Sequence, residues 1–335
     1  MAEPTVTAVI TVQDRREFVR SAIASAGAAG ADEILVVRNF SDPLDVPGVP
    51  FTDVRCDLVP TGAKQALGVE RAHGEIVALL DDDDLWEPEK VRRLRAEFAR
   101  RPELVYFDHA QRAIDREGRP VAAHHDEYVG KDPTRFGATA PEDLWTLTER
   151  VWPGNSSSTA LRRAWATEWL GALREAEWAA DFVWFAVALL DRPDGIALSP
   201  EPLTRLRLHG QNMSQSRGVA AEEFRRRHAE QNARWARAYG VLHRLALERR
   251  GPTNGITRYL AENVVGFEFQ RDLERGEHPR RAAGRALREG PGLRRRGLWA
   301  VAWASILAPS LGRRMLYRAS ERRSSVAPTV PGRGA

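Results

Sequence analysis

The chain has almost no cysteine and no long hydrophobic run. Cys56 is the only cysteine among 335 residues, which excludes an intramolecular disulfide and a cysteine-based metal cluster and favours a reducing compartment. No segment reaches the ~20 consecutive apolar residues that a membrane-spanning helix needs. The first residues have neither a basic start nor a long apolar stretch, so no signal peptide is expected. Together these absences predict a cytoplasmic protein.

The two parts of the chain differ in charge. Residues 1–215 hold 25 Lys and Arg against 35 Asp and Glu, a net of −10, whereas residues 216–335 hold 25 against 11, a net of +14. The whole chain is 43% hydrophobic, which is typical of a folded globular protein, and its length allows one large domain with an extension or two domains. An acidic first part and an arginine-rich second part predict different partners for each.

Short apolar segments alternate with amphipathic ones in roughly the first 110 residues. Strands that alternate with helices form parallel sheets with helices on their faces, so we expect an α/β fold with a mixed, mostly parallel sheet. Beyond residue 216 only helices are predicted, and residues 324–335, rich in Pro, Gly and Ser, are expected to be disordered. The predicted strands of the first part occupy residues 5–12, 33–37 and 76–80. The predicted helices occupy residues 18–26 and 61–72, and Pro88 opens a further helix.

Four consecutive carboxylates, Asp81 to Asp84, follow the apolar run at residues 76–80. Such a run is typical of a buried parallel strand, and open α/β sheets bind ligands at the carboxyl ends of their strands. Adjacent carboxylates repel and raise one another's pKa unless a cation offsets their charge. Hard divalent ions prefer oxygen ligands, so these acids predict a Mg²⁺ or Mn²⁺ site. The alternative, that Asp84 and Glu87 only favour the start of a helix, explains two of the acids better than four.

Four patterns follow one another along residues 5–215. They are residues 7–16, residues 72–90 with the acids, residues 155–163 with the later Ala180-Asp181, and residues 206–214. Together they resemble family 2 glycosyltransferases of the GT-A fold. The resemblance implies a GT-A catalytic domain over residues 1–215, with a donor half at about 1–110 and an acceptor half at about 111–215. A basic helical extension at residues 216–323 and a tail at 324–335 would follow.

The resemblance also implies roles for the acids and for a histidine. Asp81 to Asp83 would be the DxD triplet, in which Asp81 and Asp83 bind a Mn²⁺ or Mg²⁺ ion and His209 completes its shell. That ion would neutralise charge on the leaving nucleoside diphosphate. Asp181 would be the general base that takes the proton of an acceptor hydroxyl, with inversion at the anomeric carbon. The plain alternatives are a helix N-terminal acid for Asp181 and a loop histidine for His209.

The binding residues follow from the same resemblance, although the donor-base pocket departs from the family pattern. The second strand ends in Arg38-Asn39 instead of an acidic pair, and Gln65-Ala66 replaces an Arg-Asn pair. The amide oxygen of Asn39 can accept a hydrogen bond from the N3–H of uracil or thymine. The residues expected to bind the donor are Thr11, Gln13, Arg15, Asn39, Lys64 and Asp82, and those expected to bind the acceptor are Trp152, Asn155, Ser156, Ser157 and Ala180.

The arginine-rich second part of the chain has a pattern that predicts a partner of its own. Residues 280–323 contain twelve arginines and two acids around the apolar segment 298–308. As a helix this segment rises only ~16 Å, short of the ~30 Å hydrocarbon core of a bilayer. Basic flanks around tryptophans suit a helix that lies in the interface of an anionic membrane. The alternative is that the segment packs on the catalytic domain, and no recognition motif accompanies the charge to favour nucleic acid.

These observations predict a cytoplasmic, metal-dependent inverting glycosyltransferase, peripheral on the inner face of the membrane. It would move a sugar from a nucleotide-diphosphate sugar to a glycan or lipid-linked acceptor. One alternative is a nucleotidyltransferase-like enzyme, which is expected to have a glycine-rich loop after the first strand, whereas residues 13–16 contain no glycine. The other is a non-catalytic glycan- or membrane-binding relative, which Arg38-Asn39 favours and the retained acids oppose.

Overall fold

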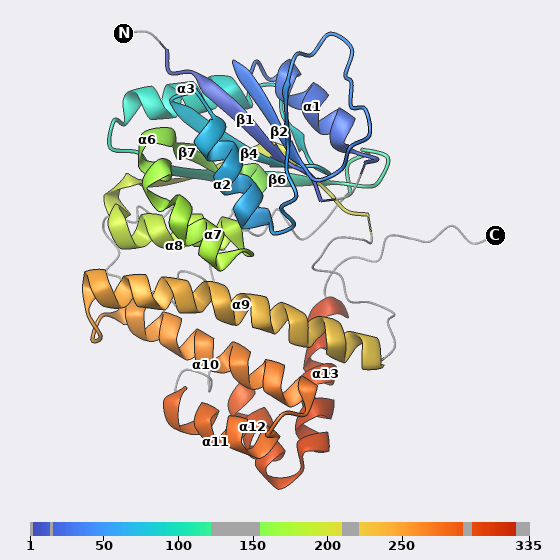
Figure 1. Cartoon of the computed structure of the whole chain (residues 1–335), viewed down its shortest axis with the longest axis vertical. Helices are drawn as coiled ribbons and strands as arrows, with labels where there is room; N and C mark the ends of the chain where they lie inside the picture. The colour runs from blue at the N-terminus through green and yellow to red at the C-terminus, as the bar shows by residue number, and fades with distance from the viewer. Residues whose placement is uncertain (1–2, 14–15, 122–154, 210–220, 291–296, 326–335) are drawn as a thin grey trace, which may run out of the picture. The chain divides into compact units, whose positions relative to one another are not determined.

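The chain forms two compact units. The computed structural model describes residues 3–13, 16–121, 155–209, 221–290 and 297–325. One unit comprises Met1–Leu208 and the other His209–Ala335. Figure 1 shows the sheet and its helices in the first unit and the helices α9 to α13 in the second.

A mixed sheet of eight strands forms the centre of the first unit, in the order β3-β2-β1-β4-β7-β6-β8-β5. Strands β3, β2, β1 and β4 are parallel neighbours, β7 lies antiparallel between β4 and β6, β8 is parallel to β6, and β5 is antiparallel to β8. The predicted α/β class with a mixed, mostly parallel sheet is therefore confirmed. The strands are β1 (Val6–Thr11), β2 (Glu33–Arg38), β3 (Thr52–Arg55), β4 (Ile76–Asp81), β5 (Leu85–Trp86), β6 (Tyr106–Ile114), β7 (Ala160–Arg162) and β8 (Ile196–Arg207).

The chain reverses its direction across the sheet between β1 and β4. From β1 it proceeds outward to β2 and β3, and it then crosses back to β4 on the other side of β1. In the register of these two strands Thr11 is opposite Asp81, so both strands end at the same edge. Such a reversal leaves a crevice at the carboxyl ends of the two strands, where open α/β sheets bind ligands. The sheet thus delivers the acids to the expected position.

Helices cover both faces of this sheet because side chains alternate along β1. On one face Val6, Ala8 and Ile10 pack with the buried residues of α1 and α3 in a single core. On the other face α2 approaches so closely that a Cβ on Gly68 would lie 2.3 Å from Cγ1 of Val9, which accounts for the glycine. The helices of this unit are α1 (Val19–Ala28), α2 (Thr61–Arg71), α3 (Lys90–Arg100), α6 (Arg163–Ala166), α7 (Leu170–Ala176) and α8 (Ala180–Asp191).

The second unit is helical throughout its described part, as predicted for the C-terminal extension. Its core includes Val265, Phe269 and Leu273 of α10 together with Leu298 and Val301 of α12. No helix in the described part of the chain is long and apolar enough to cross a membrane. The helices are α9 (Ala221–Arg250), α10 (Gly255–Arg275), α11 (Pro279–Glu289), α12 (Leu298–Leu307) and α13 (Pro309–Ser325).

Candidate active site

The acids at the end of β4 are tied to the end of β1. The main-chain N–H of Gln13 donates a hydrogen bond to Oδ2 of Asp82 at 2.8 Å. Asp82 is fully buried, Asp83 is 6% exposed, and Asp81 is partly exposed at the last position of the strand. The ends of β1 and β4 are therefore held together, with Asp81 and Asp83 at the same edge of the sheet.

Asp84 holds the predicted acceptor segment, residues 155–163, against the other acids. Its carboxylate accepts hydrogen bonds from Nδ2 of Asn155 at 3.0 Å and from Oγ of Ser157 at 2.7 Å, and also from the main-chain N–H of Arg207 at 2.9 Å. Burial and the charge of Asp83 raise the pKa of Asp84 to about 7, while these hydrogen bonds oppose the rise. Because its oxygens are engaged within the protein, Asp84 joins the two segments instead of facing a ligand.

Arg207 is a residue of this site that the sequence did not single out. Its Nε donates to the main-chain oxygen of Asp83 at 2.9 Å, and Nη1 donates to that of Arg116 at 2.7 Å. The guanidinium lies over the ring of Phe18, 4.6 Å from its centre. Arg207 is 4% exposed, so its contacts fix the conformation of the acidic segment. The only available signal was its place in the last of the four patterns, two residues before His209.

The acids fit a metal that is shared with a substrate. No group of three or more His, Cys, Asp or Glu side chains among the described residues could hold a metal ion by itself. Mg²⁺ at nucleotide sites is usually held by one or two carboxylates together with substrate phosphates and water. Asp81 and Asp83 at the sheet edge match that donor set. His209 is buried two residues after β8, and its part in the metal shell stays a prediction.

Three of the predicted donor residues lie around the end of β1. Nε2 of Gln13 donates to the main-chain oxygen of Val59 at 2.9 Å and to Oγ1 of Thr61 at 2.8 Å, which joins β1 to the start of α2. Thr11 is buried, and the fully buried Lys64 donates through Nζ to the main-chain oxygen of Val12. These three predicted residues therefore cluster around the β1 end, and Lys64 supports it from within the protein.

At the end of β2, Arg38 is bonded within the protein, whereas the next residue, Asn39, is a candidate contact for a ligand. Nε and Nη2 of Arg38 donate to the two carboxylate oxygens of Asp53 at 2.7 and 2.6 Å, and the arginine is 1% exposed. This pairing raises the pKa of Arg38 and lowers the pKa of Asp53. Beside it, Oδ1 of Asn39 is buried and has no hydrogen-bond partner among the described residues. A buried acceptor without a partner costs free energy, so this oxygen suits a donor group on a ligand.

The acceptor segment is built around a 3₁₀ turn, η3 (Ser156–Ser158). Oδ1 of Asn155 accepts a hydrogen bond from the main-chain N–H of Ser157 at 2.6 Å and so caps the turn. Oγ of Ser156 accepts from Nε2 of Gln65 at 2.8 Å, and Nε1 of Trp184 donates to Oε1 of Gln65 at 3.0 Å. Gln65, which departs from the family pattern, thus links α2 with η3 and α8.

Asp181 lies in the first turn of α8, directly after the buried Ala180. Oδ1 of Asp181 accepts a hydrogen bond from the main-chain N–H of Phe182 at 2.8 Å. Burial raises the pKa of Asp181, and hydrogen bonds to main-chain N–H groups partly oppose the rise. A raised pKa brings a carboxylate closer to the proton affinity that general-base catalysis requires near neutral pH. The predicted contacts Arg15 and Trp152 lie outside the described residues.

Known proteins resemble this chain in part of its sequence and in its fold. Residues 60–159, which include α2, the acids and the acceptor segment, match the family model described as Glycosyl transferase family 2. The solved structure of residues 1–349 of S. aureus TarS is 14% identical, with a TM-score of 0.50, over 94% of this chain and 91% of that chain. Its complex with UDP-GlcNAc is 13% identical, with a TM-score of 0.48, over 88% and 92%. No curated protein sequence matches this chain. At such identities the structural likeness concerns the fold, and it agrees with the GT-A fold predicted above.

Proposed function

We propose that this chain, which belongs to glycosyltransferase family 2, transfers a sugar from a nucleotide-diphosphate donor to a hydroxyl group of a glycan or lipid-linked acceptor. The observation that carries the proposal is the acidic segment at the sheet reversal. Asp82 is bonded to the β1 end, where the donor residues gather, and Asp84 is bonded to the acceptor segment. The residues proposed to bind the donor and those proposed to bind the acceptor are thus bonded to the carboxylates that precede and follow Asp83.

The donor base is proposed to bind beside Asn39. The N3–H of uracil or thymine would give the buried Oδ1 of Asn39 the partner that it lacks among the described residues. Cytosine presents an acceptor at N3, so its ring nitrogen cannot donate to this oxygen. The proposal therefore favours UDP- and TDP-sugars, with Thr11, Gln13, Lys64 and Asp82 organising the adjoining strand end.

Asp81 and Asp83 would hold a Mn²⁺ or Mg²⁺ ion at the diphosphate, with His209 as a further ligand. When bound, such an ion stabilises the negative charge that develops on the leaving nucleoside diphosphate. The chain's own contribution is to keep Asp83 in position, through the hydrogen bond from Arg207 to its main-chain oxygen. Asp82 and Asp84 are engaged in holding the neighbouring segments.

Asp181 is proposed as the general base. Its carboxylate takes the proton of the acceptor hydroxyl as that oxygen bonds to the anomeric carbon, while the bond from this carbon to the diphosphate oxygen breaks. The nucleoside diphosphate leaves with the bonding electron pair, and one displacement inverts the anomeric centre. The raised pKa of Asp181 supports this role, since it makes the carboxylate a stronger base than an exposed aspartate.

The second unit is proposed to contact the inner face of a membrane through an apolar ridge. The ridge consists of Trp303, Leu307 and Leu311, which are 51%, 77% and 42% exposed. Trp303 and Leu307 are four residues apart on α12, so they lie on one face of the helix. The opposite face of α12 packs in the core of the unit through Val301 and Ala302. Large exposed apolar side chains that gather in this way mark an interaction surface.

An anionic bilayer is the partner that the surrounding charge favours. Arg314 and Arg318 follow Leu311 at helical spacing on α13, and both are exposed. A helical segment that inserts apolar side chains into the membrane interface, with arginines beside them, is the usual form of an interfacial anchor. Such an anchor would keep the enzyme at the surface where a lipid-linked acceptor is found.

A thermal-shift screen tests the proposed activity. Purified protein would be heated with UDP-, TDP-, GDP- and CDP-sugars, each with and without Mn²⁺. Because a ligand that binds only the folded state raises its stability, a true donor raises Tm by an amount that depends on the metal. Stabilisation by UDP- or TDP-sugars only in the presence of Mn²⁺ is the expected result. No stabilisation by any nucleotide sugar would favour a non-catalytic relative.

A further inference from the structure

The connection between α7 and α8 has an unusual backbone. Glu177 adopts φ 64° and ψ −48°, and the main-chain N–H of Trp178 donates to the carbonyl oxygen of Ala176 at 2.7 Å. This combination is the strained γ-turn with positive φ, which is rare in proteins. Two residues later Ala179 is left-handed, with φ 55° and ψ 40°. Asp181 follows after one more residue.

Strain of this kind persists only where the surroundings impose it. Neither Glu177 nor Ala179 is a glycine, so each bears the steric cost of positive φ. The structure around them supplies one direct restraint, because the main-chain N–H of Gly62 donates to the carbonyl oxygen of Glu177 at 2.8 Å. That bond joins the first turn of α2 to the centre of the strained turn.

Only glycine fits at position 62. A Cβ there would lie 2.8 Å from the carbonyl oxygen of Leu173 and 2.9 Å from that of Glu177. Both are main-chain atoms, which cannot move aside as the end of a flexible side chain can. Any larger residue must therefore displace the turn or the helix. Gly171 is a matched contrast on α7, since a Cβ added there meets nothing within 4 Å.

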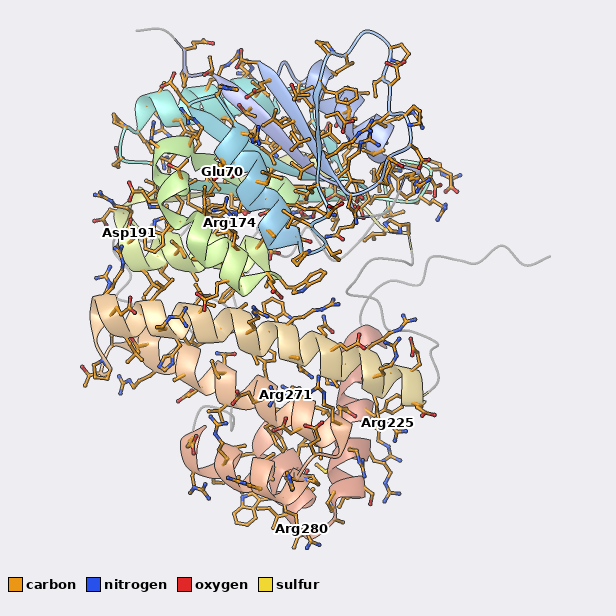
Figure 2. The ribbon with its side chains drawn as sticks, in the orientation of Figure 1. Glu70, Arg174, Asp191, Arg225, Arg271 and Arg280 are labelled. Atoms are coloured by element: carbon orange, nitrogen blue, oxygen red, sulfur yellow. The ribbon has the colours of Figure 1, made fainter. Side chains whose placement is uncertain are left out.

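The same turn of α2 also contacts the donor and acceptor sides. Oγ1 of Thr61 accepts a hydrogen bond from Gln13 at the β1 end, and Gln65 bridges Ser156 and Trp184. At the other end of the helix, Nη2 of Arg174 on α7 donates to Oε2 of Glu70 at 2.9 Å, and both residues are labelled in Figure 2. α2 is therefore bonded to α7 at two levels and also contacts Gln13 on the donor side and Ser156 on the acceptor side.

We propose that Gly62 is a positioning residue for the transfer reaction, which acts through the carbonyl oxygen of Glu177 to hold the strained turn that sets the place of Asp181. This inference rests on the proposed function, in which Asp181 is the base. The hydrogen bond from Gly62 keeps the strained turn in one conformation, and the other contacts of α2 link that conformation to the residues after β1. A bound donor and the base are thereby held at a fixed separation.

Gly62→Ala tests the proposal, with Gly171→Ala as the control. The assay is release of UDP from a UDP-sugar chosen by the thermal-shift screen, with water as the acceptor, since water also needs a base. Gly62→Ala is expected to lower kcat by about 10²-fold, because misplacing a reacting group by about 1 Å costs that much. The affinity for UDP with Mn²⁺, measured by calorimetry, should stay within about twofold, as twofold is a small change in binding free energy. The acidic limb of the kcat–pH profile should move as well.

The outcomes separate positioning from folding. A Gly62→Ala protein with the kcat of Gly171→Ala overturns the proposal, and so does a parallel loss of kcat, UDP affinity and Tm. If Gly62→Ala does not fold, Glu177→Gly decides the question. Glycine relaxes the strained turn without a clash, so Tm should stay unchanged while kcat falls. An unchanged kcat in Glu177→Gly overturns the proposal. Asp181→Asn keeps the two proposals distinct. If that variant turns over normally while Gly62→Ala does not, the assignment of the base fails, and with it the claim that Gly62 acts by positioning Asp181.

Discussion

The main-chain N–H of Gln13 and the carboxylate of Asp82 join the two strands at which the sheet reverses direction, at a distance of 2.8 Å. Residues 69 positions apart in the chain thereby become one edge of the candidate site. The side chain of Gln13 extends this edge to Thr61 on α2, and Asp84 extends it to the acceptor segment. The site is therefore a chain of hydrogen bonds across the carboxyl ends of the sheet, with Asp83 at its middle.

Replacing Asp181 by asparagine is expected to preserve nucleotide affinity and to lower turnover by about 10²–10⁴-fold, because an amide cannot accept the acceptor's proton. The base works only when it is ionised, so wild-type kcat should fall as pH drops through the pKa of Asp181, which lies above that of an ordinary aspartate. UDP release across pH 4–9 measures both effects.

Asp191→Asn is a matched control at the other end of α8, labelled in Figure 2. Asp191 accepts a hydrogen bond from Nε1 of Trp165 at 2.9 Å, and an amide oxygen can accept the same bond. This variant should keep the wild-type profile. Near-normal turnover in Asp181→Asn would mean that the base is another group.

Asn39→Ala should weaken UDP and TDP binding by roughly 2–10-fold, because the loss of one hydrogen bond costs about 0.5–1.5 kcal/mol of binding free energy. Asn39→Asp should bind nearly as well as wild type, because a carboxylate also accepts from N3–H. CDP, which lacks that donor, should bind all three proteins equally weakly. Calorimetry with the three nucleotides makes the comparison, and an equal loss of CDP affinity in Asn39→Ala would argue against a base contact.

Asp108 gives the stability of the protein a predictable pH dependence. It is buried, and its carboxylate accepts hydrogen bonds from the hydroxyl of Tyr106 at 3.1 Å and from Oγ1 of Thr159 at 3.2 Å. Burial raises the pKa of Asp108 to about 7, and the charge of Lys90 acts in the opposite direction. The folded protein thus binds this proton more tightly than the unfolded chain does. The contribution to stability is complete below about pH 4 and is lost as pH rises to about 7.

Asp108→Asn should remove this slope, since an amide does not titrate. Between pH 4 and 7 the free energy of unfolding of wild type should fall relative to that of the variant by up to about 4 kcal/mol, at about 1.4 kcal/mol per pKa unit. Denaturant unfolding at several pH values measures the difference. Parallel profiles for the two proteins over this range would show that Asp108 does not carry the raised pKa.

Removing the apolar ridge should detach the protein from anionic bilayers. Trp303→Ser with Leu307→Ser is expected to abolish co-sedimentation of the full chain with phosphatidylglycerol vesicles, while Leu247→Ser, which alters a residue 39% exposed on α9, should not. Arg314→Gln and Arg318→Gln should each reduce partitioning about fivefold, at about 1 kcal/mol per basic residue. Binding should also weaken as salt rises. A wild-type chain that ignores anionic vesicles would contradict the ridge as an anchor.

The sequence could predict what depends on local pattern. The apolar run before Asp81 and the alternation of strands and helices indicated the sheet, and the acids were expected at its ligand-binding edge. Arg207 was missed because its contact with Asp83 joins residues 124 positions apart, and no local pattern records such a contact. The strained turn was missed for another reason: Glu177 and Ala179 are not the glycines that normally signal positive φ. Gln65 was visible as a departure from the family pattern, but only the fold reveals the two groups that it joins.

Calorimetry of UDP binding with and without Mn²⁺ tests the central claim, that the acids at the sheet reversal bind a nucleoside diphosphate through a metal. The comparison uses wild type, Asp83→Ala and, as a control, Asp194→Ala, which alters an exposed acid in η5 (Pro193–Gly195). Wild type and Asp194→Ala should bind UDP more tightly when Mn²⁺ is present, and Asp83→Ala should lose that gain. Metal-dependent binding that persists unchanged in Asp83→Ala, or no binding of UDP by wild type, would contradict the claim.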